Sequence, residues 1–262
     1  MQVWQAIILG AVQGFAEFLP ISSSGHLILL GRWLGVEDGG LFFDVMLHIG
    51  TLIPVIIVFF KDILALFKKP FNKLVLLVIA TIPAALTGAI LGDVVEGAFY
   101  EGTIVSACLL SATFLLTATE LFLSEVVSKK THADLPLNRK RATIMGLAQG
   151  VAIVPGLSRS GTVISAGCFA KLNKNDNASF AFLMSIPIIL GAALVSGAKV
   201  LKNGAVINFT PLLFGVITSA VTGYIAIKIM LNVIRKANYK WFSLYLVFMA
   251  LSSIITKVAL GV

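Results

Sequence analysis

Residues 13–26 read QGFAEFLPISSSGH and place a glutamate, three serines, a histidine, a proline and two glycines within a strongly apolar chain. Of the 262 residues, 58% are hydrophobic and 12% are charged, whereas a soluble domain carries about a quarter charged residues. The composition therefore predicts a protein that lies in a membrane. Because polar groups buried in such surroundings are costly without partners, this stretch indicates a polar site inside the protein.

Six apolar runs surround this stretch, and each is long enough to cross a bilayer as a helix, which takes about 20 residues. The runs cover residues 42–60, 74–92, 103–123, 177–198, 209–230 and 241–260. Lysine and arginine gather between them in three segments, at 61–73, 124–141 and 231–240. The positive-inside rule places these segments in the cytoplasm, and it leaves both termini and the acidic segment 93–101 outside. The runs then alternate in direction, and only Lys199 and Lys202 depart from the rule.

Two segments remain outside the six runs, residues 1–41 and 142–176. Each must start and end on one side of the membrane if the runs alternate. Each is interrupted in its middle by proline, serine and glycine, in LPISSSG (19–25) and VPGLSRSG (154–161). Because the halves on either side of the interruptions are short for full spans, we predict two re-entrant hairpins, each made of a helix, a break and a second helix.

The two hairpins are related in sequence. Residues 13–26 align without a gap with residues 149–162, QGVAIVPGLSRSGT, and six positions are identical. Each hairpin is followed by three runs, and an odd number of crossings per copy forces the two copies into opposite orientations. The identical pairs are Gln13/Gln149, Gly14/Gly150, Ala16/Ala152, Ser22/Ser158, Ser24/Ser160 and Gly25/Gly161.

The predicted fold class is therefore an all-α polytopic membrane protein of two inverted repeats, each a re-entrant helix hairpin followed by three transmembrane helices. The whole chain, 1–262, forms a single integral membrane domain. Its repeats lie roughly at 1–123 and 142–260, and the basic cytoplasmic linker 124–141 joins them. Inverted repeats with broken helices place polar sites near the bilayer midplane.

Both breaks are followed by serine and glycine, and serine is typical of a helix start. A helix N-terminus offers unpaired N–H groups and partial positive charge, and therefore binds anions such as phosphate. Arg159 adds a guanidinium that can hold two phosphate oxygens at once, and it can also form a resting ion pair with Glu17 that opens when phosphate enters. The predicted phosphate-binding residues are Ser22, Ser24, Gly25, Ser158, Arg159, Ser160 and Gly161.

The first hairpin adds acid–base chemistry to anion binding. Glu17, His26 and a serine can act as acid, base and nucleophile. Gln13 and Glu17 lie four residues apart and hence on one helical face, where they could offer oxygen atoms to a Mg²⁺ or Ca²⁺ that bridges phosphates. The predicted catalytic residues are Glu17, Ser23, His26 and Arg159.

With these motifs the chain resembles the bacterial undecaprenyl-pyrophosphate phosphatase family, also called the bacitracin-resistance protein family. The first family motif, (E/Q)GxxEFLPxSSxGH, is met at every fixed position from Gln13 to His26, and the second, PGxSRSG, is met at 155–161. The resemblance covers the whole chain. It implies six spans, two re-entrant hairpins, inverted repeats and a divalent-metal requirement. It also implies an enzyme of the bacterial cytoplasmic membrane that removes the terminal phosphate of undecaprenyl pyrophosphate, the lipid carrier of cell-wall peptidoglycan synthesis.

The resemblance also implies roles for individual residues. Gln13 stands where the family also allows glutamate, so Glu17 is expected to be the main carboxylate for a metal. Two routes remain open: either Ser23 attacks while His26 or Glu17 takes its proton, or Glu17 activates water, and attack by Ser23 is favoured. Because the first hairpin enters from the outer face, the active site is expected to open there. The family's functional positions fall on Gln13, Glu17, Ser22, Ser23, His26, Ser158, Arg159 and Ser160.

The expected partners are a polyprenyl pyrophosphate and membrane lipids, and a homodimer is left open. The net charge of +8 is attributed to cytoplasmic lysine and arginine, so no nucleic-acid partner is expected. The rival function is a lipid-phosphate flippase or a small-anion carrier, because inverted repeats and broken helices are typical of transporters. A carrier needs only a binding site, whereas glutamate, serine and histidine in one hairpin alone suit chemistry. His48 is interpreted as a structural hydrogen-bonding residue, and His132 as a solvated one.

Overall fold

The computed structural model describes residues 1–36, 40–130, 134–203 and 208–261, and within these ranges it contains helices and no strand. His132 lies outside the described residues. In chain order the helices are α1 (Val3–Phe18), α2 (Ser23–Trp33), α3 (Gly40–Val58), α4 (Phe60–Leu66), α5 (Asn72–Tyr100), α6 (Ile104–Lys130), α7 (Arg139–Val151), α8 (Arg159–Phe169), α9 (Lys174–Asn203), α10 (Phe209–Lys236) and α11 (Lys240–Leu260).

Five of these helices, α5, α6, α9, α10 and α11, are long and apolar enough to cross a membrane. A sixth candidate is the pair α3 and α4, which is bent by 84° across Phe59. The six predicted apolar runs coincide with these six units. The prediction of an all-α polytopic membrane protein is therefore confirmed.

The spanning helices extend beyond the apolar runs into polar sequence. α5 continues through most of the acidic segment 93–101 and ends shortly before Gly102, which has a φ of +69°. Glycine adopts this left-handed conformation without steric cost and therefore ends helices. α6 likewise continues into the predicted linker as far as Lys130. The helices end where the backbone turns, whereas the sequence analysis ended them where hydropathy falls.

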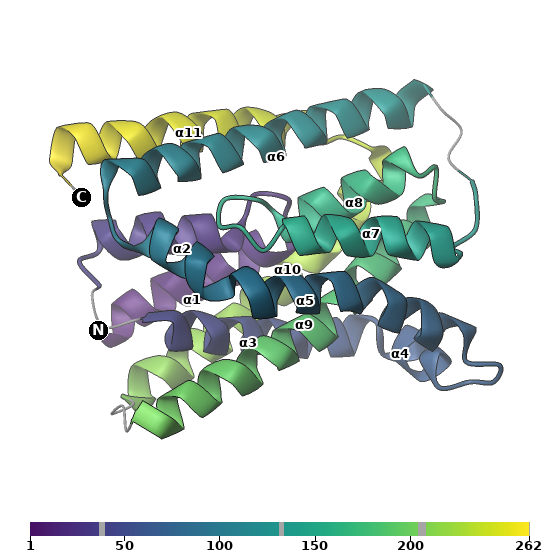
Figure 1. Cartoon of the computed structure of the whole chain (residues 1–262), viewed down its shortest axis with the longest axis horizontal. Helices are drawn as coiled ribbons and strands as arrows, with labels where there is room; N and C mark the ends of the chain where they lie inside the picture. Colours follow the sequence, from purple (N-terminus) through teal and green to yellow (C-terminus); the bar gives the residue numbers. More distant parts are fainter. Residues whose placement is uncertain (37–39, 131–133, 204–207, 262) are drawn as a thin grey trace.

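Each predicted hairpin is a helix, a break and a second helix. The four helices have 16, 11, 13 and 11 residues, fewer than the roughly 20 that a full span needs. The two breaks meet in the middle of the molecule (Figure 1), where Ser160 Oγ donates a hydrogen bond to the carbonyl oxygen of Leu19 at 3.3 Å. A Cβ on Gly25 would lie 3.1 Å from the Cα of Gly156, so the absence of a side chain at Gly25 permits the close approach of the two breaks. The re-entrant placement of the hairpins in a membrane stays a prediction.

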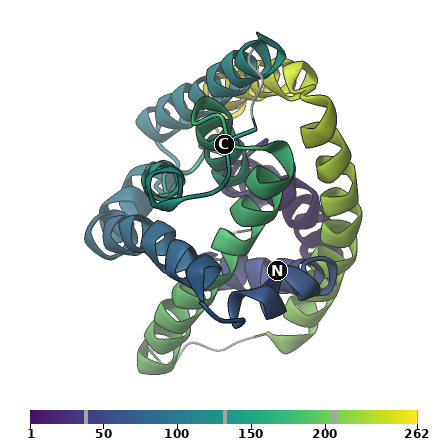
Figure 2. The same cartoon turned by 90° about the vertical axis from the view of Figure 1, so that its right-hand side faces the viewer.

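Glycines also fix the first helix of each hairpin against a long helix. α1 packs on α10 and α7 packs on α5. A Cβ on Gly10 would overlap the carbonyl oxygen of Gly215, and a Cβ on Gly146 would lie 2.6 Å from the carbonyl oxygen of Ala80. Gly10 and Gly146 are related by the same alignment as the hairpins. Small residues of this kind let helix backbones pack closely in membranes, and Figure 2 shows the long helices around the hairpins.

The order of elements, a hairpin followed by three spanning units, occurs twice along the chain. α6 and α11, which close the two copies, pack together and run in opposite directions (Figure 1). Inverted copies require this antiparallel arrangement. The inverted relation of the complete repeats stays a prediction.

Candidate active site

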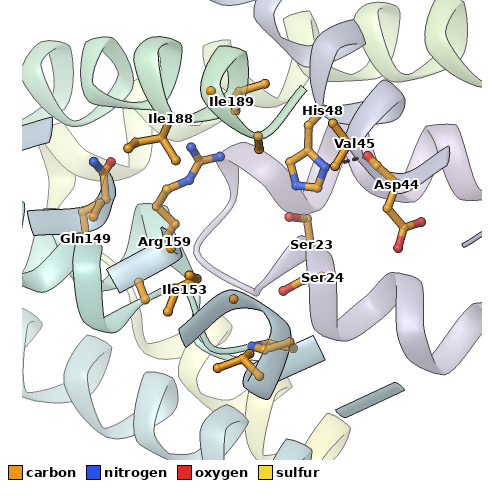
Figure 3. Close-up of a pocket in the computed structure, with 18 of the residues that line it drawn as sticks. Ser23, Ser24, Asp44, Val45, His48, Gln149, Ile153, Arg159, Ile188 and Ile189 are labelled. Atoms are coloured by element: carbon orange, nitrogen blue, oxygen red, sulfur yellow. Dashed lines mark hydrogen bonds between the residues drawn. The ribbon is translucent and has the colours of Figure 1, made fainter. Parts of the chain in front are cut away.

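A cavity of about 630 Å³ lies where the two hairpins meet α3, α5 and α9. Figure 3 shows Ser23 of α2, His48 of α3, and Gln149 and Arg159 of the second hairpin among the residues that line it. Glu17 of α1 also lines it. Most of the remaining lining consists of small and aliphatic side chains of α5 and α9, so a polar patch faces an apolar wall.

Glu17 is the centre of the polar patch and is 6% exposed. Its Oε2 accepts hydrogen bonds from Ser23 Oγ at 2.8 Å and from Gln13 Nε2 at 3.1 Å. The same oxygen lies 3.2 Å from Nε2 of His48. Its Oε1 forms an ion pair with the guanidinium of Arg159. A buried carboxylate requires such partners, and both of its oxygens have them.

The ion pair between Glu17 and Arg159 was one of the predicted states of the arginine and is confirmed. Removing one partner of a buried ion pair costs about 3–5 kcal/mol, because the other charge is left uncompensated. A phosphate can replace the carboxylate, because a guanidinium binds both anions through two parallel hydrogen bonds. Arg159 can therefore exchange its partner when an anion enters, and Glu17 then becomes available to accept a proton.

Both predicted serine caps are present. Ser22 accepts a hydrogen bond from the backbone N–H of Gly25 at 3.4 Å, and Ser158 accepts one from Gly161 at 3.1 Å. α2 and α8 therefore begin with the same contact. Because the positive end of a helix lies at its N-terminus, two such ends lie at the breaks, next to the polar patch.

The other predicted phosphate-binding residues are placed differently. Ser24 lines the cavity, whereas the Ser160 hydroxyl is engaged with the carbonyl oxygen of Leu19. A Cβ on Gly161 would lie 3.2 Å from the Cβ of Pro20, so this glycine permits close packing of the two breaks. Phosphate binding by these residues stays a prediction.

The structure does not bring His26 to Glu17 or Ser23. Its Nδ1 lies 2.7 Å from the carbonyl oxygen of Ser22, and its Nε2 lies 2.7 Å from the hydroxyl of Tyr245 on α11. The ring stacks on that of Tyr245 with centroids 5.5 Å apart. Neutral His26 satisfies both contacts, since Nδ1–H can donate and Nε2 can accept. His26 thus connects α2 to α11. Its ring makes these contacts and not one with Glu17 or Ser23, so the structure gives no support to its predicted catalytic role.

His48, which the sequence analysis interpreted as a structural residue, contacts Glu17 instead. Its Nδ1 lies 2.7 Å from the carbonyl oxygen of Asp44, and its Nε2 lies 3.2 Å from Glu17 Oε2. Both partners are acceptors, so the imidazolium satisfies both and the neutral ring satisfies one. His48 can therefore share a proton with Glu17. An ionisable residue within an apolar run is by default a candidate for function, and this signal could have identified it.

Two buried glutamines, Gln13 and Gln149, occupy equivalent positions in the hairpins and are 0% and 2% exposed. Gln13 donates to Glu17, but its Oε1 has no hydrogen-bond partner among the residues that the structure describes. Within the same residues, neither amide atom of Gln149 has a partner. An unsatisfied buried polar group costs about 1–3 kcal/mol. Such groups in native proteins indicate a ligand, an ion or a water molecule.

Glu17 and Gln13 Oε1 provide oxygen atoms of the kind that Mg²⁺ and Ca²⁺ bind. Within the described part of the chain, no group of three or more His, Cys, Asp and Glu side chains is placed to hold a metal. Mg²⁺ is usually held by one or two carboxylates together with substrate phosphates. These residues therefore fit a cation that binds with phosphate oxygens, and the metal requirement stays a prediction.

Beyond the polar patch the cavity continues between α5 and α9 toward Asp93 and Lys199, which form an ion pair of 2.9 Å. This contact gives Lys199, one of the two exceptions to the positive-inside pattern, a carboxylate partner in the acidic segment 93–101. A second apolar pocket of about 260 Å³ lies between α5 and α9 and shares Thr81, Ala85 and Pro187 with the first. The polar patch is thus continuous with an apolar groove between these helices.

A family model described as bacitracin resistance protein BacA matches residues 6–252. The chain belongs to this family. The resemblance inferred from the motifs at 13–26 and 155–161 is thereby confirmed. The undecaprenyl-diphosphatase of Carboxydothermus hydrogenoformans is 40% identical and covers 99% of each chain. Those of Thermodesulfovibrio yellowstonii and Methanosphaera stadtmanae are 37% and 36% identical and cover 95% and 99% of this chain, and 97% and 100% of their own.

Proposed function

We propose that this chain hydrolyses undecaprenyl pyrophosphate to undecaprenyl phosphate and inorganic phosphate. Its relatives carry the name undecaprenyl-diphosphatase, and it shares their family. The observation that carries the proposal is the contact of Ser23 and Arg159 with the two oxygens of Glu17. This arrangement brings a nucleophile and an anion-binding group, each at a helix N-terminus, to one base, as phosphoryl transfer requires.

The shape of the cavity supports a lipid substrate. The polar patch suits a charged head group, whereas the adjoining groove between α5 and α9 is lined by small and aliphatic residues. An isoprenoid chain can lie in this groove or pass between the helices into the bilayer while the pyrophosphate reaches Arg159. A soluble phosphate ester would leave this apolar surface uncovered.

The reaction begins when the terminal phosphate replaces Glu17 as the partner of Arg159. Glu17 takes the proton of Ser23, and Ser23 Oγ attacks the terminal phosphorus. The bond from this phosphorus to the bridging oxygen breaks, and undecaprenyl phosphate leaves with the bridging oxygen and the proton from Glu17. Water then attacks the phosphoserine after giving a proton to Glu17. The bond to Ser23 Oγ breaks, this oxygen recovers the proton, and inorganic phosphate is released.

A direct attack by water is the competing route. Glu17 would then deprotonate water, and Ser23 would only hydrogen-bond to the carboxylate. The two routes differ in the configuration at phosphorus, which is retained after two displacements and inverted after one. Retention with a chirally labelled terminal phosphate would establish the phosphoserine, and inversion would establish the direct route.

His48 and Gln13 hold Glu17 in position in this mechanism. Both contact Oε2, the oxygen that also accepts from Ser23. When Arg159 turns to phosphate, they keep the carboxylate beside the serine hydroxyl. Such positioned contacts maintain the geometry on which proton transfer depends.

A divalent cation is also part of the proposal. Glu17 and Gln13 Oε1 would hold it together with phosphate oxygens, and it would neutralise negative charge on the pyrophosphate. Loss of phosphate release after chelation, and recovery with Mg²⁺ or Ca²⁺, would support this role. Full turnover in excess chelator would exclude it.

We place the protein in the bacterial cytoplasmic membrane with the cavity open to the outer face. The cavity extends to Asp93, which belongs to the acidic segment 93–101 predicted to lie outside. In a background with Cys108 and Cys168 replaced, Gly97→Cys should react in intact cells with an impermeant thiol reagent, and Ala133→Cys should not. Equal or reversed labelling would overturn the orientation.

The decisive experiment is phosphate release from undecaprenyl pyrophosphate by the purified chain in detergent, where no membrane separates two compartments. A phosphatase releases phosphate under these conditions. A flippase or small-anion carrier binds the lipid or anion and releases none. The absence of phosphate release from a folded protein that still binds the lipid would therefore favour the carrier.

A further inference from the structure

Gln149 has no hydrogen-bond partner among the described residues, and the sequence of the second hairpin explains why. In the first hairpin Gln13 donates to Glu17, four residues further along the same helical face. The residue four positions after Gln149 is Ile153, which offers no acceptor. Both Gln149 and Ile153 line the cavity. The amide has a protein acceptor in the first copy, whereas in the second it faces the cavity and has no acceptor among the described residues.

The packing of α7 keeps Gln149 in this place. Gly146 and Gly150 lie on either side of it in sequence, and a Cβ on them would lie 2.6 Å from the carbonyl oxygen of Ala80 and 3.2 Å from the hydroxyl of Thr87. α7 therefore rests closely on α5. Rotation of α7 that would carry the amide of Gln149 to another partner would break this contact.

The chemistry of the cavity identifies the missing partner. A glutamine amide has two N–H donors and one carbonyl acceptor. In Figure 3, Gln149 and Ser23 lie on opposite sides of Arg159. A ligand that places one anionic group at Ser23 and a second one at Gln149, with Arg159 between them, matches this order. A diphosphate has two such groups joined by one oxygen.

We propose that Gln149 binds the lipid-bearing phosphate of the substrate and makes the site select a diphosphate over a monophosphate. This rests on the proposed hydrolysis of a polyprenyl pyrophosphate. The terminal phosphate lies at Ser23 and Arg159, and the second phosphate accepts a hydrogen bond from the Gln149 amide. A lipid monophosphate has a single phosphate, which binds at the charged Arg159 and leaves the Gln149 amide unused, so it is held less tightly than the diphosphate.

The test uses the full chain in detergent and two probes, a polyprenyl methylenebisphosphonate, in which CH₂ replaces the bridging oxygen, and the matching monophosphate. Gln149→Leu removes the amide at nearly constant size. Ser185→Ala is the control, because the Ser185 hydroxyl bonds the carbonyl oxygen of Phe182 in its own helix. Affinities, KM, kcat and melting temperatures are measured for each protein.

We expect Gln149→Leu to lose about tenfold in affinity for the bisphosphonate and to raise KM similarly, which corresponds to one lost hydrogen bond to a charged group. Its affinity for the monophosphate should match that of Ser185→Ala, and its melting temperature should be no lower, because leucine removes a buried amide that has no partner among the described residues. Gln149→Asn, which keeps a shorter amide, should recover part of the preference. A structural role would instead lower the melting temperature and weaken both probes alike.

Two outcomes separate this inference from the proposed function. If the wild-type chain releases phosphate and Gln149→Leu keeps the wild-type preference for the bisphosphonate, the amide is merely hydrated and the inference is wrong. If the wild-type chain releases no phosphate but prefers the bisphosphonate, and Gln149→Leu loses this preference, the proposed hydrolysis is wrong and the binding role of Gln149 is supported.

Discussion

The two hairpins share one frame and differ in the chemistry on it. Ser22 and Ser158 cap the second helix of each hairpin through the same hydrogen bond. The residue after the cap is Ser23 in the first hairpin and Arg159 in the second, and both contact Glu17. Glu17 itself has Ile153 as its counterpart. The duplication therefore places two equivalent residues beside one carboxylate. Serine at position 23 can act as the nucleophile, and arginine at position 159 can bind the anion.

The backbones of the two caps differ as well. Ser22 has a φ of +69°, whereas Ser158 has a φ of −79°. A residue other than glycine in the left-handed region costs about 1–3 kcal/mol, and such residues cluster at functional sites. The strained cap precedes the predicted nucleophile, and the relaxed cap precedes the arginine. The asymmetry thus extends from side chains to backbone, as expected of an enzyme more than of a symmetric carrier.

The largest expected effect comes from removing the carboxylate of Glu17, which has the uncharged Ile153 as its counterpart in the second hairpin. Glu17→Gln keeps the size of the side chain but removes its basicity, and loss of a general base lowers kcat by about 10²–10⁴-fold. The variant should also melt at a lower temperature, because Arg159 loses its buried counter-charge. Phosphate release and thermal unfolding are measured together.

The double variant Glu17→Gln/Arg159→Gln separates these two effects. It removes both charges and should regain much of the lost stability, while activity stays absent. Activity in Glu17→Gln close to that of the wild type would show that this carboxylate is not the base.

The second expected effect concerns the arginine at the position equivalent to Ser23. Arg159→Lys keeps a positive charge but cannot form two parallel hydrogen bonds to phosphate. We expect kcat/KM to fall by at least about tenfold, or 1.4 kcal/mol of transition-state stabilisation. Steady-state kinetics with undecaprenyl pyrophosphate provide the measurement, with Arg141→Lys as a control, since Arg141 hydrogen-bonds backbone carbonyls at the other end of the second hairpin. Equal kcat/KM values for Arg159→Lys and Arg141→Lys would show that Arg159 does not bind the phosphate through two parallel hydrogen bonds.

How much the sequence could predict depends on whether a feature is local. Hydropathy, serine caps and charge pairing predicted the spans, the breaks and the contact of Glu17 with Arg159. The environments of the two histidines could not be predicted, because they depend on distant helices. Tyr245, which binds His26, lies 219 residues away, and His48 reaches Glu17 through the packing of α3 beside α1. In the sequence, Gln149 could be noticed only because it is identical to Gln13 in the repeat, since only the folded cavity reveals that it has no partner among the described residues.

The third expected effect separates those two histidines. His48→Gln should lower kcat by about 3–10-fold, because Glu17 keeps its other contacts but loses one that positions it. Tyr245→Phe removes the hydroxyl that His26 binds, so it should lower the melting temperature and leave kcat unchanged. Kinetics and unfolding of both variants are compared under one set of conditions. A large loss of kcat in Tyr245→Phe would indicate that His26 has a catalytic role after all.

The smallest expected effect lies at the mouth of the cavity, far from either break. Asp93 is 88% exposed in its side chain and lies 2.9 Å from Lys199, and exposed ion pairs of this kind contribute little to stability. Lys199→Met should therefore leave kcat and the melting temperature unchanged. It should raise KM by about twofold at low ionic strength, because a positive charge near the entrance attracts an anionic head group, and this effect should disappear at high salt as the charge is screened. A fall in kcat/KM as large as that expected for Arg159→Lys would mean that the reacting phosphate binds near the mouth, and the proposed roles of Ser23 as nucleophile and Arg159 as phosphate-binding group would then be wrong.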